Sequence, residues 1–115
     1  MKTIEKLHLK ENEREALLEL KKKLYKRFPG AEIILYGSKV RGDADEESDI
    51  DILVLLNQKV DDHLREEIFS LSFKIELKYD VIFGILIESR HYWNSDLARA
   101  MPIHWNIDKE GIPVK

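Results

Sequence analysis

Residues 50–56 limit the possible folds of this chain more than any other segment does. Every residue in this stretch is apolar except Asp51. A strand with apolar side chains at nearly every position needs cover on both of its faces. We therefore expect residues 50–56 to form a strand that is buried on both sides.

An amphipathic helix is predicted before this strand. Asn12 and Glu15 have the spacing of a capping box, which marks the start of a helix. Leu17, Leu20 and Leu24 then recur at helical spacing, and Pro29-Gly30 ends the pattern. The basic residues near its end indicate a solvated helix face: Lys21, Lys22, Lys23, Lys26 and Arg27.

The remaining segments predict a mixed sheet with helices. Residues 31–36 suit a strand, residues 39–48 a short helical turn followed by a loop, and residues 79–87 a third strand. A second helix is expected from five apolar residues on one face: Val60, Leu64, Ile68, Leu71 and Ile75. One or two short helices should follow, with a boundary at Met101-Pro102 and an ending at Gly111. This order predicts a two-layer domain of the α/β (α+β) class.

Composition excludes several classes of protein. The 115 residues carry a formal net charge of −3, which does not favour direct nucleic-acid binding. The absence of cysteine excludes disulfide scaffolds and thiolate metal sites. No stretch reaches the ~20 apolar residues of a membrane span, so we expect a cytoplasmic protein with no membrane partner.

Asp49 and Asp51 are the first candidates for chemistry. They stand two apart at the start of a strand, so both carboxylates are expected on the same face. Two such charges ~6 Å apart repel by roughly 3 kcal/mol at an effective dielectric near 20. Mg²⁺ is the natural counter-ion, because it prefers carboxylate oxygens and keeps positions open for substrate phosphates.

Gly37-Ser38 is the second half of the predicted site. It follows a strand directly, at the carboxyl end where open α/β sheets place their ligands. Glycine lets the backbone approach a phosphate, and the serine hydroxyl and following amides can donate to phosphate oxygens. Taken alone, a turn that merely ends a strand would explain Gly37-Ser38 equally well.

Further side chains extend this site. Asp80 precedes an apolar segment and is a candidate third carboxylate, which would allow two metal ions to be held. Arg41 could contact phosphate oxygens or balance the acids, and Lys39 is a weaker candidate. Ser48 could orient the loop that presents Asp49.

The aromatic and imidazole side chains are assigned to structure. The four histidines have no metal-ligand spacing and are expected at the surface or in packing. Tyr92, Trp93 and Trp105 are expected in a C-terminal core or at a partner surface.

These residues together resemble the signature of the polymerase-beta-like nucleotidyltransferases. That signature is Gly-Ser, ten residues, then Asp-x-Asp, and here the ten residues are 39–48. The Arg41-Gly42 and Ser48-Asp49 pairs are similar to the minimal nucleotidyltransferase subgroup, as is the segment 107–111. Val40 stands where alanine is commoner in that subgroup.

The resemblance implies a polymerase-beta-like fold, a small mixed sheet flanked by helices, with residues 1–115 as a single nucleotidyltransferase domain. It implies that Asp49, Asp51 and Asp80 are catalytic and hold Mg²⁺, and that Gly37 and Ser38 bind the nucleotide phosphates. Many such proteins serve as antitoxins of a HEPN-domain ribonuclease toxin, and members of that group transfer AMP from ATP to a tyrosine of the toxin. The resemblance therefore implies ATP as substrate and a HEPN-domain toxin as partner.

Other functions stay open at this point. The chain could neutralise a toxin by binding alone, using the apolar and aromatic C-terminal residues. It could also modify a small-molecule hydroxyl, although such enzymes usually need an added substrate-binding domain. A nucleic-acid polymerase fits the acidic balance less well.

Overall fold

The computed structural model describes residues 7–42 and 49–115. The elements in chain order are α1 (Glu11–Arg27), β1 (Glu32–Tyr36), α2 (Ser38–Arg41), β2 (Ile50–Leu56), α3 (Asp62–Tyr79), β3 (Phe83–Ser89), α4 (Arg90–Trp93), α5 (Asp96–Arg99), α6 (Pro102–Glu110) and β4 (Ile112–Pro113).

The strands form one mixed sheet in the order β3-β2-β1-β4. β1 pairs with both β2 and β4 in antiparallel fashion, and β2 pairs with β3 in parallel. The expected small mixed sheet is therefore confirmed. β2 lies inside this sheet, and all of its residues are buried except Asp51, which is half-buried.

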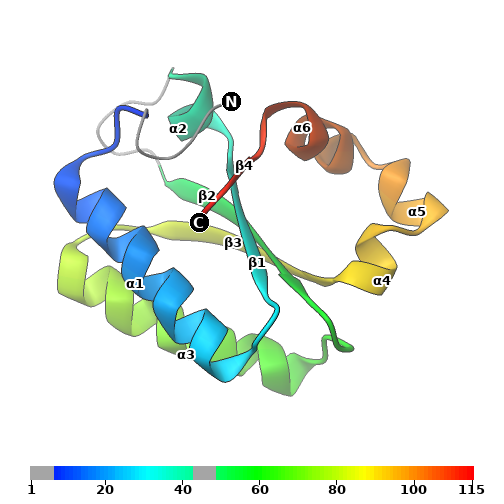
Figure 1. The fold of residues 1–115 in the computed structure, drawn as a ribbon, viewed down its shortest axis with the longest axis horizontal. Coiled ribbons are helices and arrows are strands. Elements are labelled where there is room, and N and C mark those ends of the chain that lie inside the picture. Colours follow the sequence, from blue (N-terminus) through cyan, green and yellow to red (C-terminus); the bar gives the residue numbers. More distant parts are fainter. Residues whose placement is uncertain (1–6, 43–48) are drawn as a thin grey trace.

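Helices cover both faces of the sheet. In Figure 1, α1 and α3 lie along one face, and α4, α5 and α6 gather at the other. The expectation of two layers was incomplete, because the C-terminal helices form a third. The apolar character of β2 requires this arrangement, since side chains alternate between two faces that both need cover.

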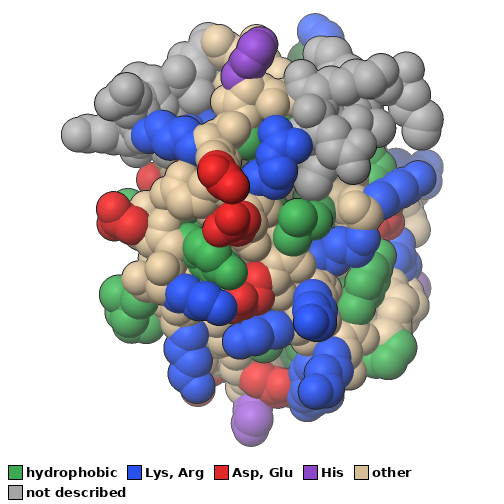
Figure 2. Space-filling model, turned by 60° about the vertical axis from the view of Figure 1, so that its left-hand side comes forward, with side chains coloured by type: hydrophobic (Ala, Val, Ile, Leu, Met, Phe, Trp, Pro, Cys, Tyr) green, Lys and Arg blue, Asp and Glu red, His purple; other side chains and the backbone are tan. Residues whose placement is uncertain are grey.

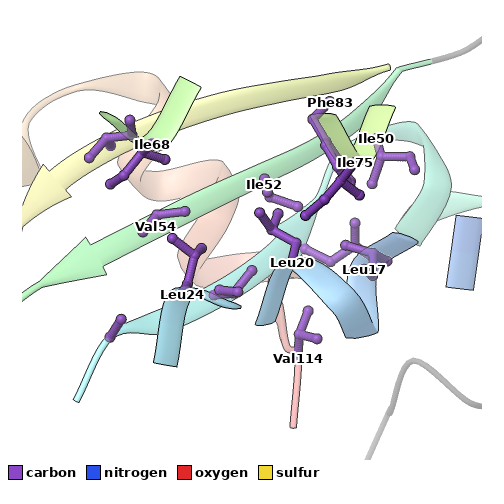
Figure 3. Close-up of a cluster of buried hydrophobic side chains, with 14 of the residues drawn as sticks. Leu17, Leu20, Leu24, Ile50, Ile52, Val54, Ile68, Ile75, Phe83 and Val114 are labelled. Atoms are coloured by element: carbon purple, nitrogen blue, oxygen red, sulfur yellow. The ribbon is translucent and has the colours of Figure 1, made fainter. Parts of the chain in front are cut away.

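The larger core lies between the sheet and the pair α1 and α3. Figure 3 shows Leu20 of α1 and Ile75 of α3 directed toward Ile52 of β2, and Leu24 of α1 beside Val54 of the same strand. These five side chains are completely shielded from solvent. The residues predicted for the inner faces of the two long helices therefore form this core.

A smaller core lies on the opposite face. Leu53 and Leu55 of β2 pack there with Trp93 of α4 and Ile107 of α6. His104 stacks on the Trp93 ring at 4.2 Å between centroids, and its Nε2 lies 2.9 Å from the Trp93 carbonyl oxygen. The expected packing role of Trp93 is confirmed, whereas Trp105 is 63% exposed.

The start of α1 differs from the prediction. The helix begins at Glu11, and the Glu13 carboxylate accepts the backbone N–H of Lys10 at 2.9 Å. Asn12 therefore lies inside the first turn and does not cap it. Its side-chain amide instead donates to the Tyr79 carbonyl oxygen at 2.9 Å, which ties the start of α1 to the end of α3.

The third strand begins later than predicted. Residues 79–82 were expected in the strand, but α3 continues to Tyr79 and ends at Asp80 in the left-handed conformation, with φ 56°. The side chain of Glu76 accepts the backbone N–H of Phe83 at 2.8 Å. The last turn of the helix thereby sets the point at which β3 starts.

The C-terminal segment returns to the sheet. Met101 precedes α6 and Pro102 occupies its first turn, as predicted. β4 was not predicted, because Gly111 was expected to end the ordered elements. Ile112 instead pairs with Leu35 of β1, which brings the end of α6 beside the carboxyl end of β1.

The surface of α1 and α3 is strongly charged. Figure 2 shows Lys and Arg side chains across this side of the molecule, with acidic and apolar side chains between them. Four of the five basic residues near the end of α1 are exposed and the fifth is half-buried, which confirms a solvated helix face. In the described part of the chain, no helix is long and apolar enough to cross a membrane.

We predict that Gly111→Ala destabilises the fold. A Cβ at Gly111 would lie 2.5 Å from the Ile107 carbonyl oxygen and 2.7 Å from Cγ2 of Ile34. Relieving this overlap should cost roughly 1–3 kcal/mol, because α6 must move away from β1. Urea unfolding measures the loss. Asn106→Ala, on the exposed side of α6, is the control, and equal stability of the two variants would contradict the close packing.

Candidate active site

Asp51 lies on the sheet face that α4 and α6 cover. Ile50 and Ile52 point into the core beneath α1 and α3, and Leu53 points into the opposite core. Because side chains alternate along a strand, Asp51 shares the face of Leu53. Asp49 is exposed immediately before β2, and the same alternation places it on this face.

Two glycines make room for the Asp51 carboxylate. A Cβ at Gly37 would lie 2.5 Å from Oδ2 of Asp51, and a Cβ at Gly84 would lie 2.7 Å from Oδ1. Gly37 follows β1, and Gly84 pairs with Asp51 across the parallel ladder of β2 and β3. Any side chain at either position would meet the carboxylate.

Burial and charge both disfavour ionised Asp51. Burial raises the pKa of its carboxyl group above the ordinary value, and the neighbouring Asp49 charge raises it further. The Arg41 guanidinium opposes this increase, whereas Glu110 adds to it. Tyr36, the partner of Asp51 on β1, has a phenol pKa raised by burial and then by the Asp51 charge.

The Gly37-Ser38 turn leads into a single helical turn. Gly37 has φ 84°, a conformation that other residues rarely adopt, and its carbonyl oxygen accepts the N–H groups of Val40 and Arg41. Ser38 is half-buried at the start of α2. The expected helical turn after residue 37 is confirmed.

Two buried side chains hold this turn against α1. Val40 is 5% exposed and belongs to the larger core. Lys39 points inward, and its Nζ lies 2.6 Å from Oε2 of Glu13, with both side chains buried. Lys39 therefore anchors the turn to the first helix.

Arg41 contacts the carboxylate of Glu110, a residue that was not predicted to belong to the site. Its Nη1 lies 3.1 Å from Oε1 and 3.3 Å from Oε2 of Glu110. The backbone N–H of Gly37 donates to the same Oε1 at 3.2 Å. Glu110 thus bridges the turn after β1 and the cation predicted to bind phosphate.

Asp80 does not join the other two aspartates in a cluster. It lies exposed at the end of α3, three residues before β3, because the helix extends further than predicted. Across residues 7–42 and 49–115, no three His, Asp or Glu side chains are placed to hold a metal ion together. Asp49 and Asp51 remain as a pair of carboxylates.

Ser48, which was predicted to orient the loop before Asp49, lies outside the described residues. Two residues of the site, Gly84 and Glu110, were not predicted from the sequence. Gly84 was missed, although a glycine inside a strand is a known sign of close approach by another group. Glu110 was missed because it lies 73 residues from Gly37, and only the likeness of residues 107–111 to the minimal subgroup pointed toward it.

The mixed sheet brings Asp51 beside the Gly37-Ser38 turn, which agrees with the resemblance of the sequence to nucleotidyltransferases. The nucleotidyltransferase domain family matches residues 17–106, and the chain belongs to this family. The protein is therefore a nucleotidyltransferase enzyme.

Two archaeal proteins are similar in sequence to this chain. The chain is 36% identical over 102 residues to "Putative protein adenylyltransferase MJ0604" of Methanocaldococcus jannaschii, covering 87% of this chain and 95% of the relative. A second protein of that organism with the same designation, MJ0141, is 38% identical over 55 residues, 48% of this chain and 56% of the relative.

The structural neighbours are toxin–antitoxin proteins. One, solved with AMP-PNP, gives a TM-score of 0.57 at 22% identity over 87% of this chain and 70% of the neighbour. Another, a variant of the MntA-HpeT pair, gives a TM-score of 0.56 at 24% identity over 94% of this chain and 73% of the neighbour. At these identities the likeness shows that the chain shares the fold of these proteins.

We predict that Asp51→Asn stabilises the protein in the absence of metal. The folded state raises the pKa of Asp51, so ionisation opposes folding once the pH passes the unfolded value near ~3.9. At neutral pH the asparagine variant should melt roughly 2–4 °C higher, a modest gain because the group is half-exposed.

Thermal melts in EDTA measure this difference across pH. The gain should disappear below about pH 4, where both states of the wild type are protonated. Asp49→Asn, at an exposed position, serves as the comparison and should gain less. A lower melting temperature for Asp51→Asn at neutral pH would contradict the electrostatic assignment.

We also predict that Lys39→Met is strongly destabilising. It leaves the Glu13 carboxylate buried without its cation, which typically costs about 3 kcal/mol or more. Adding Glu13→Gln removes the stranded charge, so the double variant should recover part of the loss. Urea unfolding of the two variants checks this. A double variant less stable than Lys39→Met would argue against a desolvated pair.

Proposed function

We propose that this nucleotidyltransferase transfers AMP from ATP to a tyrosine hydroxyl of a partner HEPN-domain toxin, in a reaction that needs Mg²⁺, and that it thereby acts as an antitoxin. The observation that carries the proposal is the approach of Asp51 to Gly37. It joins the two halves of the motif, and it places a carboxylate beside the turn proposed to hold phosphate.

The nucleotide would bind through the turn after β1. Gly37 and Ser38 are proposed to receive phosphate oxygens, and the Arg41 guanidinium to neutralise part of their charge. The close approach of backbone and carboxylate at Gly37 supports this placement, because a bound phosphate would lie near Asp51. The neighbour solved with AMP-PNP supports an adenine nucleotide.

Asp49 and Asp51 fit Mg²⁺ as donors. Both are oxygen ligands, and strand alternation places them on the same face. Burial and the Asp49 charge raise the pKa of Asp51, which means that the protein alone compensates the charge of this carboxylate poorly. Mg²⁺ is usually held by one or two carboxylates together with substrate phosphates, so two aspartates are sufficient. When bound, the metal supplies charge neutralisation at the α-phosphate and lowers the pKa of the acceptor hydroxyl.

The reaction is an in-line displacement at the α-phosphorus. The acceptor oxygen forms a new P–O bond, the bond from the α-phosphorus to the α,β-bridging oxygen breaks, pyrophosphate leaves, and the hydroxyl proton passes to solvent. The side chains of this chain contribute by positioning the triphosphate and stabilising the charge of the transition state.

A macromolecular acceptor is supported by the comparisons. The relative that the chain covers at 95% of its length carries the designation of a protein adenylyltransferase, and the solved neighbours are toxin–antitoxin proteins. The identity of the toxin as a HEPN protein and of the acceptor as tyrosine rests on the family resemblance.

Transfer of labelled AMP tests the proposal. The protein is incubated with α-labelled ATP, Mg²⁺ and the purified toxin, and the product is located by mass spectrometry. Asp49→Asn and Asp51→Asn should each lower transfer by about a hundredfold or more while staying folded. The matched control is Asp96→Asn, which removes an exposed aspartate on α5 and should retain activity.

The same assay tests the predicted third carboxylate. Asp80→Asn removes the charge and keeps a residue that tolerates the left-handed backbone at this position. A loss equal to that of the Asp49 and Asp51 variants would return Asp80 to the metal site. Normal transfer would limit the site to two aspartates. If Asp49→Asn and Asp51→Asn transfer AMP as well as the wild type, the proposed function is wrong.

A second candidate function is neutralisation by binding alone. One observation favours a protein-binding surface: Phe69, Phe73 and Leu77 lie at four-residue spacing on α3 and are 46%, 57% and 70% exposed. If Asp49→Asn and Asp51→Asn still neutralise the toxin in cells although transfer is lost, then binding suffices and catalysis is secondary.

A further inference from the structure

Glu110 occupies the groups that the nucleotide phosphates are proposed to use. Its Oε1 accepts the N–H of Gly37 at 3.2 Å and lies 3.1 Å from Nη1 of Arg41. A carboxylate is a small oxyanion, so these contacts demonstrate that the turn and Arg41 together bind one. The anion bound in this structure is the protein's own side chain.

The fold fixes Glu110 in this position. It is the last residue of α6, and Gly111 after it lies in close contact with Ile34 of β1. The pairing of Ile112 with Leu35 then holds the following residue on the sheet. The contact between Glu110 and Gly37 is therefore set by the packing of α6 and β4 against β1.

Phosphate and Glu110 cannot use the same donor together. The Gly37 N–H points its single hydrogen at Oε1 of Glu110, so a phosphate oxygen can take this donor only when the carboxylate leaves. Two anions sharing the Arg41 guanidinium would also repel each other. The Glu110 side chain is 16% exposed, and rotation about its own bonds can take the carboxylate toward solvent without moving α6.

We propose that Glu110 is an intramolecular competitor of the nucleotide: its carboxylate holds Gly37 and Arg41 until a more highly charged phosphate chain displaces it. The inference rests on the proposed function for the location of the phosphates. It has a consequence for selectivity, because ligands with several phosphate charges displace the carboxylate more readily than ligands with one or none.

Binding of inorganic tripolyphosphate tests this exchange without any catalysis. The dissociation constant is measured by calorimetry in buffer with Mg²⁺ for the wild type and for Glu110→Gln. Glutamine keeps an oxygen that can accept the N–H of Gly37, but it lacks the negative charge that pairs with Arg41 in the wild type. We expect Glu110→Gln to bind tripolyphosphate about tenfold more tightly, since a charge-assisted contact no longer has to be broken.

Glu88→Gln is the matched control. Glu88 is a carboxylate on β3 whose side chain is 17% exposed, and Arg65 lies 3.9 Å away as its cationic partner. It pairs with Leu55 near the opposite end of β2 from Asp51. The control removes the same net charge with similar burial, so its affinity for tripolyphosphate should stay within about twofold of the wild type.

Glu110→Asp gives an independent test that does not depend on the folding of Glu110→Gln. Glu110→Asp keeps the charge but shortens the side chain, which withdraws the carboxylate from Gly37, and it should also bind more tightly than the wild type. Unchanged or weaker binding in folded Glu110→Gln and Glu110→Asp would overturn the inference, as would a wild type that binds no tripolyphosphate.

These results separate the inference from the proposed function. Tighter binding of tripolyphosphate by Glu110→Gln, together with no AMP transfer by the wild type, would reject the proposed function and keep Glu110 as the competitor at a phosphate site. Efficient AMP transfer without tighter binding by the variants would reject the role of Glu110 alone.

Discussion

The carboxylate of Asp51, on a strand that is otherwise apolar, is the constraint on which the rest of this site depends. Gly37 after β1 and Gly84 on β3 both face this carboxylate, and a side chain at either position would meet its oxygens. Its strand is covered by helices on both faces, and its charge is opposed by Asp49 and only partly balanced by Arg41. The protein maintains this unfavourable arrangement, which is typical of groups retained for chemistry and not for stability.

The two helical layers pack on opposite faces of the sheet, and each contacts the turn after β1. α1 and α3 form the larger core, and α1 also receives Lys39 from the turn after β1. α6 covers the other face and supplies Glu110 to the same turn. The turn after β1 is therefore held against α1 by a buried ion pair, and it donates a hydrogen bond to a carboxylate of α6, so both helical layers pack against the same short segment.

The parts of the fold that could be predicted from sequence are those with a long local pattern. The apolar run of β2 indicated a buried strand, and alternation along it placed Asp49 and Asp51 on one face. The predicted start of β3 was wrong because residues 79–82 have strand-like composition. In the structure, the contact between the Glu76 side chain and the N–H of Phe83 decides where the strand begins. β4 has only two residues, too few to give a periodic signal.

The site was predicted to a similar extent, and for a similar reason. Gly37, Ser38 and the aspartate pair lie within one short motif, and the structure places Asp51 against Gly37. Glu110 could not be found by spacing, because only the return of the chain to β1 brings it to the motif. Asp80 was expected near the pair because its position was taken as the start of a strand, but it is the residue that follows the last turn of α3, three residues before β3 begins.

The return of the C-terminal segment to β1 also has a consequence for modularity. The signature motif is continuous, yet the surroundings of Asp51 come from β1, β2, β3 and the end of α6. A fragment comprising residues 31–56 would contain every letter of the motif and lack Gly84 and Glu110. In this protein the motif is a local sequence, whereas the site is a property of the folded domain, and grafting one would not transfer the other.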